Sequence, residues 1–138
     1  MTLRVMLDTN ILISAIVFDA DVLNLLVRLS KDRHKLFVSE YIDHEFRDKI
    51  IEKWEDKAKK ILLLYEGLMI PVMNSSLSVK CKLQDPKDEP VLSDAISNYM
   101  DVLLTGDKDF YDGNFDNIKI MTVKELDKYL DEVERGRN

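Results

Sequence analysis

Short apolar runs alternate with amphipathic helical segments along this chain, and that alternation constrains the fold more than any other feature. Each run has the length and composition of a buried strand. The runs cover residues 3–7, 36–38, 70–72, 102–104 and 118–121, with one further candidate at 78–81. Strands that alternate with helices favour a layered α/β fold with a mainly parallel sheet.

The segments between these runs carry helical patterns. Ser39 is expected to cap a helix that continues to Ile51, and Thr122 with Glu125 forms a capping-box pattern before the last helix. Apolar residues recur on one face of each predicted helix, which is typical of helices that pack on a sheet. The remaining predicted helices cover residues 11–18, 22–29, 54–68 and 88–99.

Length and composition predict a single domain spanning residues 1–138. The lone cysteine, Cys81, excludes an internal disulfide framework and fits a reducing compartment. No apolar run approaches the ~20 residues of a membrane helix. Asp8 interrupts the stretch in which a signal peptide would be apolar, so we expect a cytoplasmic protein without a membrane partner.

The net charge of −6 is concentrated in one part of the chain. Residues 81–116 hold nine acids and three bases, so this stretch accounts for the whole net charge. A solvated acidic face would explain the pattern, since net charge aids solubility. Carboxylates that converge on a cation would explain it equally well.

Four acids fall where strands end or where the following helices begin. Asp8 follows the first predicted strand, Asp107 follows the strand at 102–104, and Asp88 opens the helix before that strand. Glu45 lies near the start of the helix that Ser39 caps. Strand ends and helix starts share one edge of a parallel sheet, where clustered carboxylates repel unless a cation neutralises them. Oxygen ligands suit Mg²⁺, which indicates metal-assisted phosphodiester hydrolysis.

Other roles are open for several of these residues. Asp8, Asp88 and Asp107 could serve only as helix caps, and Asp43 and Asp48 compete with Glu45. The chain also contains isolated histidines without zinc-ligand spacing, which are expected at the surface. These are His34 and His44.

Three segments resemble the motifs of PIN domains, a family of metal-dependent ribonucleases. Residues 5–14 (VMLDTNILIS) are similar to the first motif, 88–95 (DEPVLSDA) to the third and 103–110 (LLTGDKDF) to the fourth. Residues 39–46 are similar to the less specific second motif. The resemblance extends from residue 3 to about residue 130 and is closest to VapC-like toxins of toxin–antitoxin pairs. Pro90 and the additional acid Asp94 depart from the third motif.

This resemblance implies a three-layer α/β/α fold with four or five strands and an endoribonuclease that hydrolyses RNA phosphodiester bonds. It implies Mg²⁺ or Mn²⁺ held by four catalytic acids: Asp8, Glu45, Asp88 and Asp107. It also implies supporting roles for Asn10, Thr105 and Asp109. An antitoxin protein and a second copy of the chain are the expected protein partners.

Basic residues near the motifs are candidate RNA contacts. They are Lys31, Arg33, Lys35, Arg47, Lys49 and Lys108. Two other function classes stay open: a phosphatase or phosphotransfer protein with Asp8 as nucleophile, and a catalytically inactive binding scaffold. Asn10 stands where phosphatases of the haloacid dehalogenase type carry a second aspartate, which disfavours the first alternative.

Overall fold

The computed structural model describes residues 1–75, 89–106, 108 and 118–136. A five-stranded sheet lies at the centre, with the strand order β3-β2-β1-β4-β5 and parallel pairing between all neighbours. The strands are β1 (Arg4–Leu7), β2 (Lys35–Ser39), β3 (Val72–Met73), β4 (Val102–Leu104) and β5 (Lys119–Met121). The predicted parallel α/β sheet is therefore confirmed.

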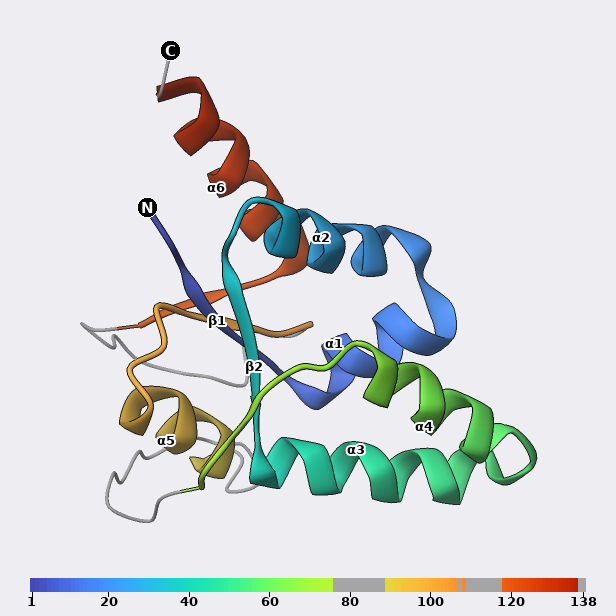
Figure 1. Cartoon of the computed structure of the whole chain (residues 1–138). Helices are drawn as coiled ribbons and strands as arrows, with labels where there is room; N and C mark the ends of the chain where they lie inside the picture. Colours follow the sequence, from blue (N-terminus) through green and yellow to red (C-terminus); the bar gives the residue numbers. More distant parts are fainter. Residues whose placement is uncertain (76–88, 107, 109–117, 137–138) are drawn as a thin grey trace.

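Helices cover both sides of the sheet. They are α1 (Thr9–Ile13), η1 (Ser14–Phe18), α2 (Ala20–Lys31), α3 (Glu40–Lys53), η2 (Glu55–Lys57), α4 (Ala58–Gly67), α5 (Glu89–Ser97) and α6 (Val123–Gly136). α2 contacts β2 and α6, whereas α5 contacts β2, β4 and α3. Figure 1 shows α2 and α6 together on one side of the strands and α3 with α5 on the other. Among the described residues, no single helix is long and apolar enough to cross a membrane.

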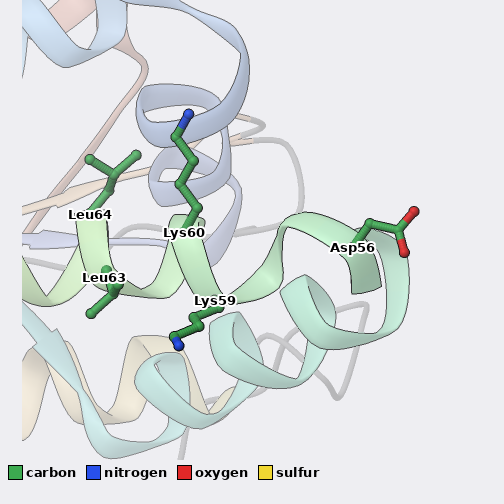
Figure 2. A pocket seen from close by; sticks show the side chains of 5 residues that line it. All are labelled: Asp56, Lys59, Lys60, Leu63 and Leu64. Atoms are coloured by element: carbon green, nitrogen blue, oxygen red, sulfur yellow. The ribbon is translucent and has the colours of Figure 1, made fainter.

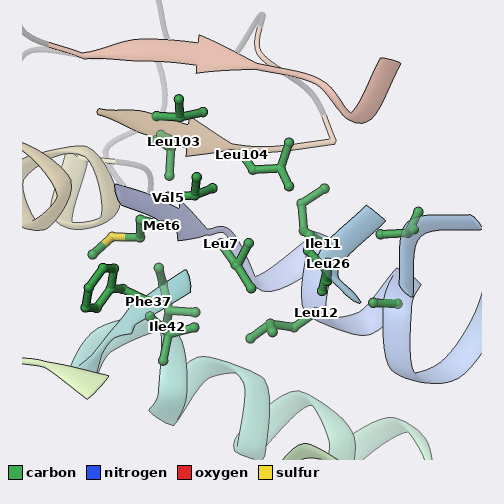
Figure 3. Close-up of a cluster of buried hydrophobic side chains, with 14 of the residues drawn as sticks. Val5, Met6, Leu7, Ile11, Leu12, Leu26, Phe37, Ile42, Leu103 and Leu104 are labelled. Atoms are coloured by element: carbon green, nitrogen blue, oxygen red, sulfur yellow. The ribbon is translucent and has the colours of Figure 1, made fainter. Parts of the chain in front are cut away.

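The central strand β1 forms the middle of the hydrophobic core. Val5, Met6 and Leu7 are fully buried, because the strand has neighbours on both edges and helices on both faces. Figure 3 shows these side chains among others from β2, β4 and the first helices. A strand buried on both faces reads as a continuous apolar run, which is why the sequence identified this strand so clearly.

Local capping residues fix where several helices begin. The Ser39 hydroxyl accepts a hydrogen bond from the backbone N–H of Ile42, which confirms the predicted N-cap of α3. The hydroxyl of Thr122 accepts from the N–H of Glu125, whose carboxylate accepts from the N–H of Thr122. The predicted capping box before α6 is therefore present.

The predicted helix boundaries differ from the structure by a few residues, and the largest differences concern two segments. The helix expected at 11–18 begins at Thr9, because Asp8 caps it, and its second half is the π-helix η1. The helix expected at 54–68 is divided, since α3 ends at Lys53 and the short turn η2 precedes α4. The candidate strand at 78–81 lies outside the described residues.

His34 is not at the surface, contrary to the sequence-based expectation. Its side chain is buried, and Nδ1 accepts a 2.9 Å hydrogen bond from the backbone N–H of Leu3. The imidazole thus satisfies a backbone donor next to the start of β1, a role that sequence spacing does not reveal. His44 is exposed as expected.

Candidate functional site

Asp8 stands at the carboxyl end of the central strand and is buried. Its backbone N–H donates to the carbonyl of Leu104 over 2.9 Å, which extends the pairing of β1 with β4 by one residue. Oδ1 of its side chain accepts a 2.7 Å hydrogen bond from the N–H of Thr9. Asp8 is therefore the N-cap of α1, as one interpretation of the sequence proposed, while its second carboxylate oxygen faces another residue.

That residue is Thr105, which follows β4. Its hydroxyl donates a 2.8 Å hydrogen bond to Oδ2 of Asp8, and its side chain is buried. In the sheet, β2 and β3 lie on one side of β1, and β4 and β5 lie on the other. The Asp8–Thr105 pair, at the ends of β1 and β4, therefore lies at the topological switch point. Ligands of open α/β sheets bind at such a point, beyond the carboxyl ends of the strands.

Glu45 on α3 is connected to the same edge through Thr9. The buried hydroxyl of Thr9 donates a 2.5 Å hydrogen bond to Oε1 of Glu45. Lys49, one turn further along α3, places Nζ 3.9 Å from the same oxygen. The structure thus brings Asp8 and Glu45 to the two sides of one residue.

The contribution of Thr9 was missed by the sequence reasoning. The signal available in the sequence was its position next to Asp8, but its contact with Glu45 spans 36 positions and depends on how α1 packs on α3.

The acids that competed with Glu45 have other surroundings. Asp43 accepts hydrogen bonds from the hydroxyl of Tyr65 at 2.7 Å and from Nε of Arg47 at 3.2 Å. Burial, and secondarily the neighbouring Asp43, raises the pKa of Tyr65 well above its usual value. Asp48 is exposed. Glu45 is therefore the acid of this helix that the structure joins to Asp8 through Thr9.

Several predicted site residues cannot be placed beside this pair. Asp88, Asp107 and Asp109 lie outside the described residues. Within the parts of the chain that are described, no three acids, histidines or cysteines gather as a metal site would need. Asn10 is exposed on the first turn of α1.

The additional acid of the third motif is engaged elsewhere. Asp94 on α5 is fully buried, and its carboxylate accepts a 2.7 Å hydrogen bond from the hydroxyl of Ser75. The Ser75 hydroxyl also accepts from the backbone N–H of Tyr41. Asp94 thus helps to hold the segment after β3 against the start of α3.

The structure divides the candidate RNA contacts into two groups. Lys31, Arg33 and Lys35 lie at or before the start of β2, which is the amino edge of the sheet and opposite to Asp8. The second group comes from α3 and from the segment after β4, near the carboxyl edge. In this group Lys49 contacts Glu45 as described. Nζ of Lys108 lies 2.8 Å from Glu125, and Arg47 forms ion pairs with Asp43 and Glu66.

The oxygen atoms at the carboxyl edge of the sheet are suitable ligands for a hard divalent cation. Asp8 and Glu45 offer carboxylate oxygens, the ligand type that Mg²⁺ and Mn²⁺ prefer. The described contacts of Asp8, with the N–H of Thr9 at Oδ1 and the hydroxyl of Thr105 at Oδ2, orient its carboxylate. Thr105 and Thr9 are placed as the hydrogen-bonding neighbours that metal ligands usually have.

Comparisons with known proteins agree with the fold of the chain. The family model described as PIN domain matches residues 4–109. VapBC2 from Rickettsia felis, solved bound to a DNA fragment from its promoter, has a TM-score of 0.68 at 17% identity, over 86% of this chain and 98% of that one. DNA-bound VapBC from Salmonella typhimurium has a TM-score of 0.63 at 15% identity, over 88% and 98%. No curated protein matched the chain.

Proposed function

The chain belongs to the PIN domain family, and we propose that it is a metal-dependent endoribonuclease that hydrolyses RNA phosphodiester bonds as the toxin of a toxin–antitoxin pair. The observation that carries the proposal is the linked set of Asp8, Thr105, Thr9 and Glu45 at the switch point of the sheet. Two carboxylates fixed by neighbouring hydroxyls at a ligand-binding edge fit phosphodiester hydrolysis better than a purely structural role.

In this proposal Asp8, Glu45, Asp88 and Asp107 hold Mg²⁺ or Mn²⁺. A divalent metal at such a site neutralises phosphate charge and activates water for attack. Asp8 is held in one orientation by Thr105 and by the start of α1, so its oxygens do not need to reorganise when a cation binds. Asn10 and Asp109 are proposed as supporting residues.

Each residue of the described set has a distinct task. Thr105 fixes Oδ2 of Asp8, while the Thr9 hydroxyl fixes the carboxylate of Glu45. The contact of Lys49 with Glu45 adds positive charge where a phosphate would approach. Among the candidate RNA contacts we therefore retain Lys49 and Lys108, which come from segments near the carboxyl edge. Arg47 pairs with two carboxylates, whereas Lys49 and Lys108 each have one described ion-pair partner.

An antitoxin is the proposed protein partner. An apolar groove of about 170 Å³ lies between α2, β2 and the segment after α4. Val27 and Leu68 line it and expose 43% and 40% of their surfaces. A partner segment that covered this groove would remove apolar surface from water. A homodimer remains a prediction of the family resemblance.

The proposal is tested with the wild-type chain and the variant Asp8→Asn, purified in parallel. Each is incubated with a pool of structured RNAs in Mn²⁺, in Mg²⁺ and in EDTA. We expect cleavage by the wild type with metal only, and none by Asp8→Asn. Equal cleavage by both proteins would mean either a contaminating nuclease, which would not respond to this substitution, or a catalytic site that does not include Asp8.

The same proteins separate the alternatives. A metal site stabilises the fold by mass action, so Mn²⁺ should raise the melting temperature of the wild type more than that of Asp8→Asn. An inactive scaffold would show no such rise. A phosphatase would release phosphate from a small phosphomonoester and leave internal RNA bonds intact, which would overturn the nuclease assignment.

A further inference from the structure

Within the described part of the chain, Lys49 and Lys108 are the only lysines that form an ion pair. Lys49 lies on α3 and Lys108 in the segment that follows β4, both near the carboxyl edge of the sheet. Lys59 and Lys60 on α4 instead line a pocket beside exposed leucines (Figure 2). An exposed lysine has a flexible side chain, so holding it in one orientation costs conformational entropy. The lysines that a carboxylate holds are therefore two that lie at the edge of the candidate site.

Glu125, on the first turn of α6, is the acid that holds Lys108. Its Oε2 accepts a 2.8 Å hydrogen bond from Nζ of Lys108, while its Oε1 accepts one of 3.1 Å from the backbone N–H of Thr122. The first contact is an ion pair with a residue 17 positions away, and the second belongs to the capping box of α6. The two oxygens of this carboxylate thus have separate tasks, which a substitution can separate.

The ion pair between Glu125 and Lys108 is formed at the surface. The hydrogen bond from Lys108, and secondarily that from the backbone of Thr122, lowers the pKa of Glu125, so the carboxylate is ionised at neutral pH. The side chains of Lys108 and Glu125 are 47% and 41% exposed. Exposed ion pairs contribute little to the stability of a fold. The main effect of this contact is therefore on the position of the Lys108 ammonium group.

The end of β5 and the start of α6 hold the segment after β4 at two points. The backbone N–H of Thr105 donates a 3.0 Å hydrogen bond to the carbonyl of Met121, which continues the pairing of β4 with β5. Three positions later in the chain, Lys108 is held by Glu125. The hydroxyl of Thr105 also donates to Asp8. The segment is therefore joined to Asp8 on one side and to the first turn of α6 on the other.

Lys108 lies within a short distance of the candidate site. Three residues of fully extended chain span at most about 11 Å, which limits the distance between the Cα atoms of Thr105 and Lys108. Thr105 in turn contacts Asp8 directly. An ammonium group is a compact positive charge that binds phosphate oxygens through charge-assisted hydrogen bonds. Lys108 is therefore suitably placed to contact a phosphate that approaches this edge.

We propose that Glu125 is a positioning residue of the nuclease, which through its ion pair with Lys108 holds the ammonium group where a phosphate of the substrate approaches the carboxyl edge. The inference rests on the proposed function and extends it to the first turn of α6. A lysine that is held before the substrate binds loses less conformational entropy on binding. The capping box accounts for the contact of Glu125 at Oε1, whereas only the positioning role uses the contact at Oε2.

Positioning and simple charge predict opposite effects when Glu125 loses its charge. RNA is a polyanion and the chain has a net charge of −6, so removal of one acid near the bound strand should by itself tighten binding. If Glu125 positions Lys108, the same removal should weaken binding, because the ammonium group then samples many orientations. The sign of the change in Kd therefore separates the two roles.

The experiment uses Glu125→Gln, because glutamine also serves in a capping box but cannot form an ion pair with Lys108. Asp127→Asn is the matched control: it removes the same charge from α6, from an acid that pairs with Arg28 at 2.7 Å. Each substitution, and Lys108→Gln, is introduced into Asp8→Asn, which is expected to bind RNA without cleaving it. Binding of a fluorescently labelled RNA of mixed sequence is measured by anisotropy at several salt concentrations, and circular dichroism checks the fold.

We expect Lys108→Gln to raise the Kd and to reduce the slope of log affinity against log salt concentration by about 0.7–1, the effect of one lost phosphate contact. Glu125→Gln should change both quantities in the same direction, whereas Asp127→Asn should leave the Kd unchanged or lower it. The variant with both Lys108→Gln and Glu125→Gln should bind no more weakly than Lys108→Gln alone, because the two residues act through one contact. A Kd that Glu125→Gln leaves unchanged or lowers, or that Asp127→Asn raises equally, would overturn the positioning role.

Cleavage kinetics with Glu125→Gln in the otherwise wild-type chain separate this inference from the proposed function. Metal-dependent cleavage with a raised KM and an unchanged kcat would support both, because a contact made equally with bound substrate and transition state acts on KM. Metal-dependent cleavage whose KM does not respond to Glu125→Gln would overturn the positioning role and leave the nuclease standing. Weaker RNA binding by Glu125→Gln, without cleavage by the wild type, would overturn the nuclease assignment and leave Glu125 and Lys108 as part of an RNA-binding surface.

Discussion

The hydroxyl of Thr105 donates a 2.8 Å hydrogen bond to Oδ2 of Asp8, and so joins two buried residues that are 97 positions apart in the chain. The bond joins the end of β4 to the end of β1, two parallel neighbours. Between them the strand order changes side, because β2 and β3 were added on one side of β1 and β4 and β5 on the other. A hydrogen bond to an ionised carboxylate is stronger than a neutral one, so this contact fixes the carboxylate in one rotamer.

Thr105→Val is expected to weaken metal binding without unfolding the protein. Valine keeps the shape of the side chain but removes the donor, and loss of such an outer contact typically costs about 10–100-fold in metal affinity or activity. The measurement is the Mn²⁺ concentration that gives half-maximal cleavage, with Thr105→Ser as the control that keeps the hydroxyl. An unchanged metal requirement in Thr105→Val would show that this bond serves folding alone.

Thr9→Val tests whether Glu45 depends on its hydrogen bond from α1. The substitution leaves Glu45 with Lys49 as its described partner, so the carboxylate gains freedom and cleavage should fall by about 10–100-fold. Thr9→Ser, which restores the hydroxyl, should recover most of the activity. Equal losses in both variants would indicate that the methyl group and its packing, rather than the hydroxyl, matter at this position.

The strand-end positions could be predicted from the sequence, whereas the contacts across the sheet could not. Asp8 and Thr105 follow continuous apolar runs, and parallel strands bring such positions to one edge. The same rule places Lys35, at the start of β2, on the opposite edge of the sheet. The predicted topology was therefore sufficient to separate Lys35 from the site. The bond between Thr9 and Glu45 depends instead on how α1 crosses α3, which residue patterns do not specify.

The π-helical geometry of η1 is a second feature beyond the reach of sequence patterns. The N–H of Asp19 donates to the carbonyl of Ser14, five residues earlier. In an α-helix the acceptor lies four residues earlier, and this difference does not change the spacing of the apolar residues. It nevertheless sets where α1 and η1 end and hence where Phe18 meets Trp54. The aromatic pair was therefore invisible until the helices were placed.

Glu45→Gln and Asp43→Asn should have opposite effects, although the two acids are neighbours on α3. Glu45→Gln removes a proposed ligand and should lower cleavage by at least about 100-fold with little change in stability. Asp43→Asn weakens the contacts with Tyr65 and Arg47 and should cost about 1–2 kcal/mol of unfolding free energy while cleavage persists. Cleavage assays and urea unfolding of both variants, with exposed Asp48→Asn as control, check this assignment.

Tyr65→Phe is expected to make the protein less sensitive to alkaline pH. Burial, together with the nearby Asp43, raises the pKa of Tyr65 above its ordinary value of 10.0. A raised pKa means that the folded state favours the neutral phenol, so its contribution is complete below the ordinary pKa and is lost as the pH rises towards the folded value. Phenylalanine has no proton to lose, and therefore removes this source of alkaline destabilisation.

At about pH 7 the variant should lose about 1 kcal/mol, because the hydrogen bond to Asp43 is absent, while Arg47 still pairs with that carboxylate. Between about pH 7 and about pH 11 the unfolding free energy of the wild type should then fall further than that of Tyr65→Phe. Urea unfolding at both pH values measures the two slopes. Parallel declines would mean that folding does not raise the pKa of Tyr65 and that other groups, such as the lysines, dominate the alkaline loss.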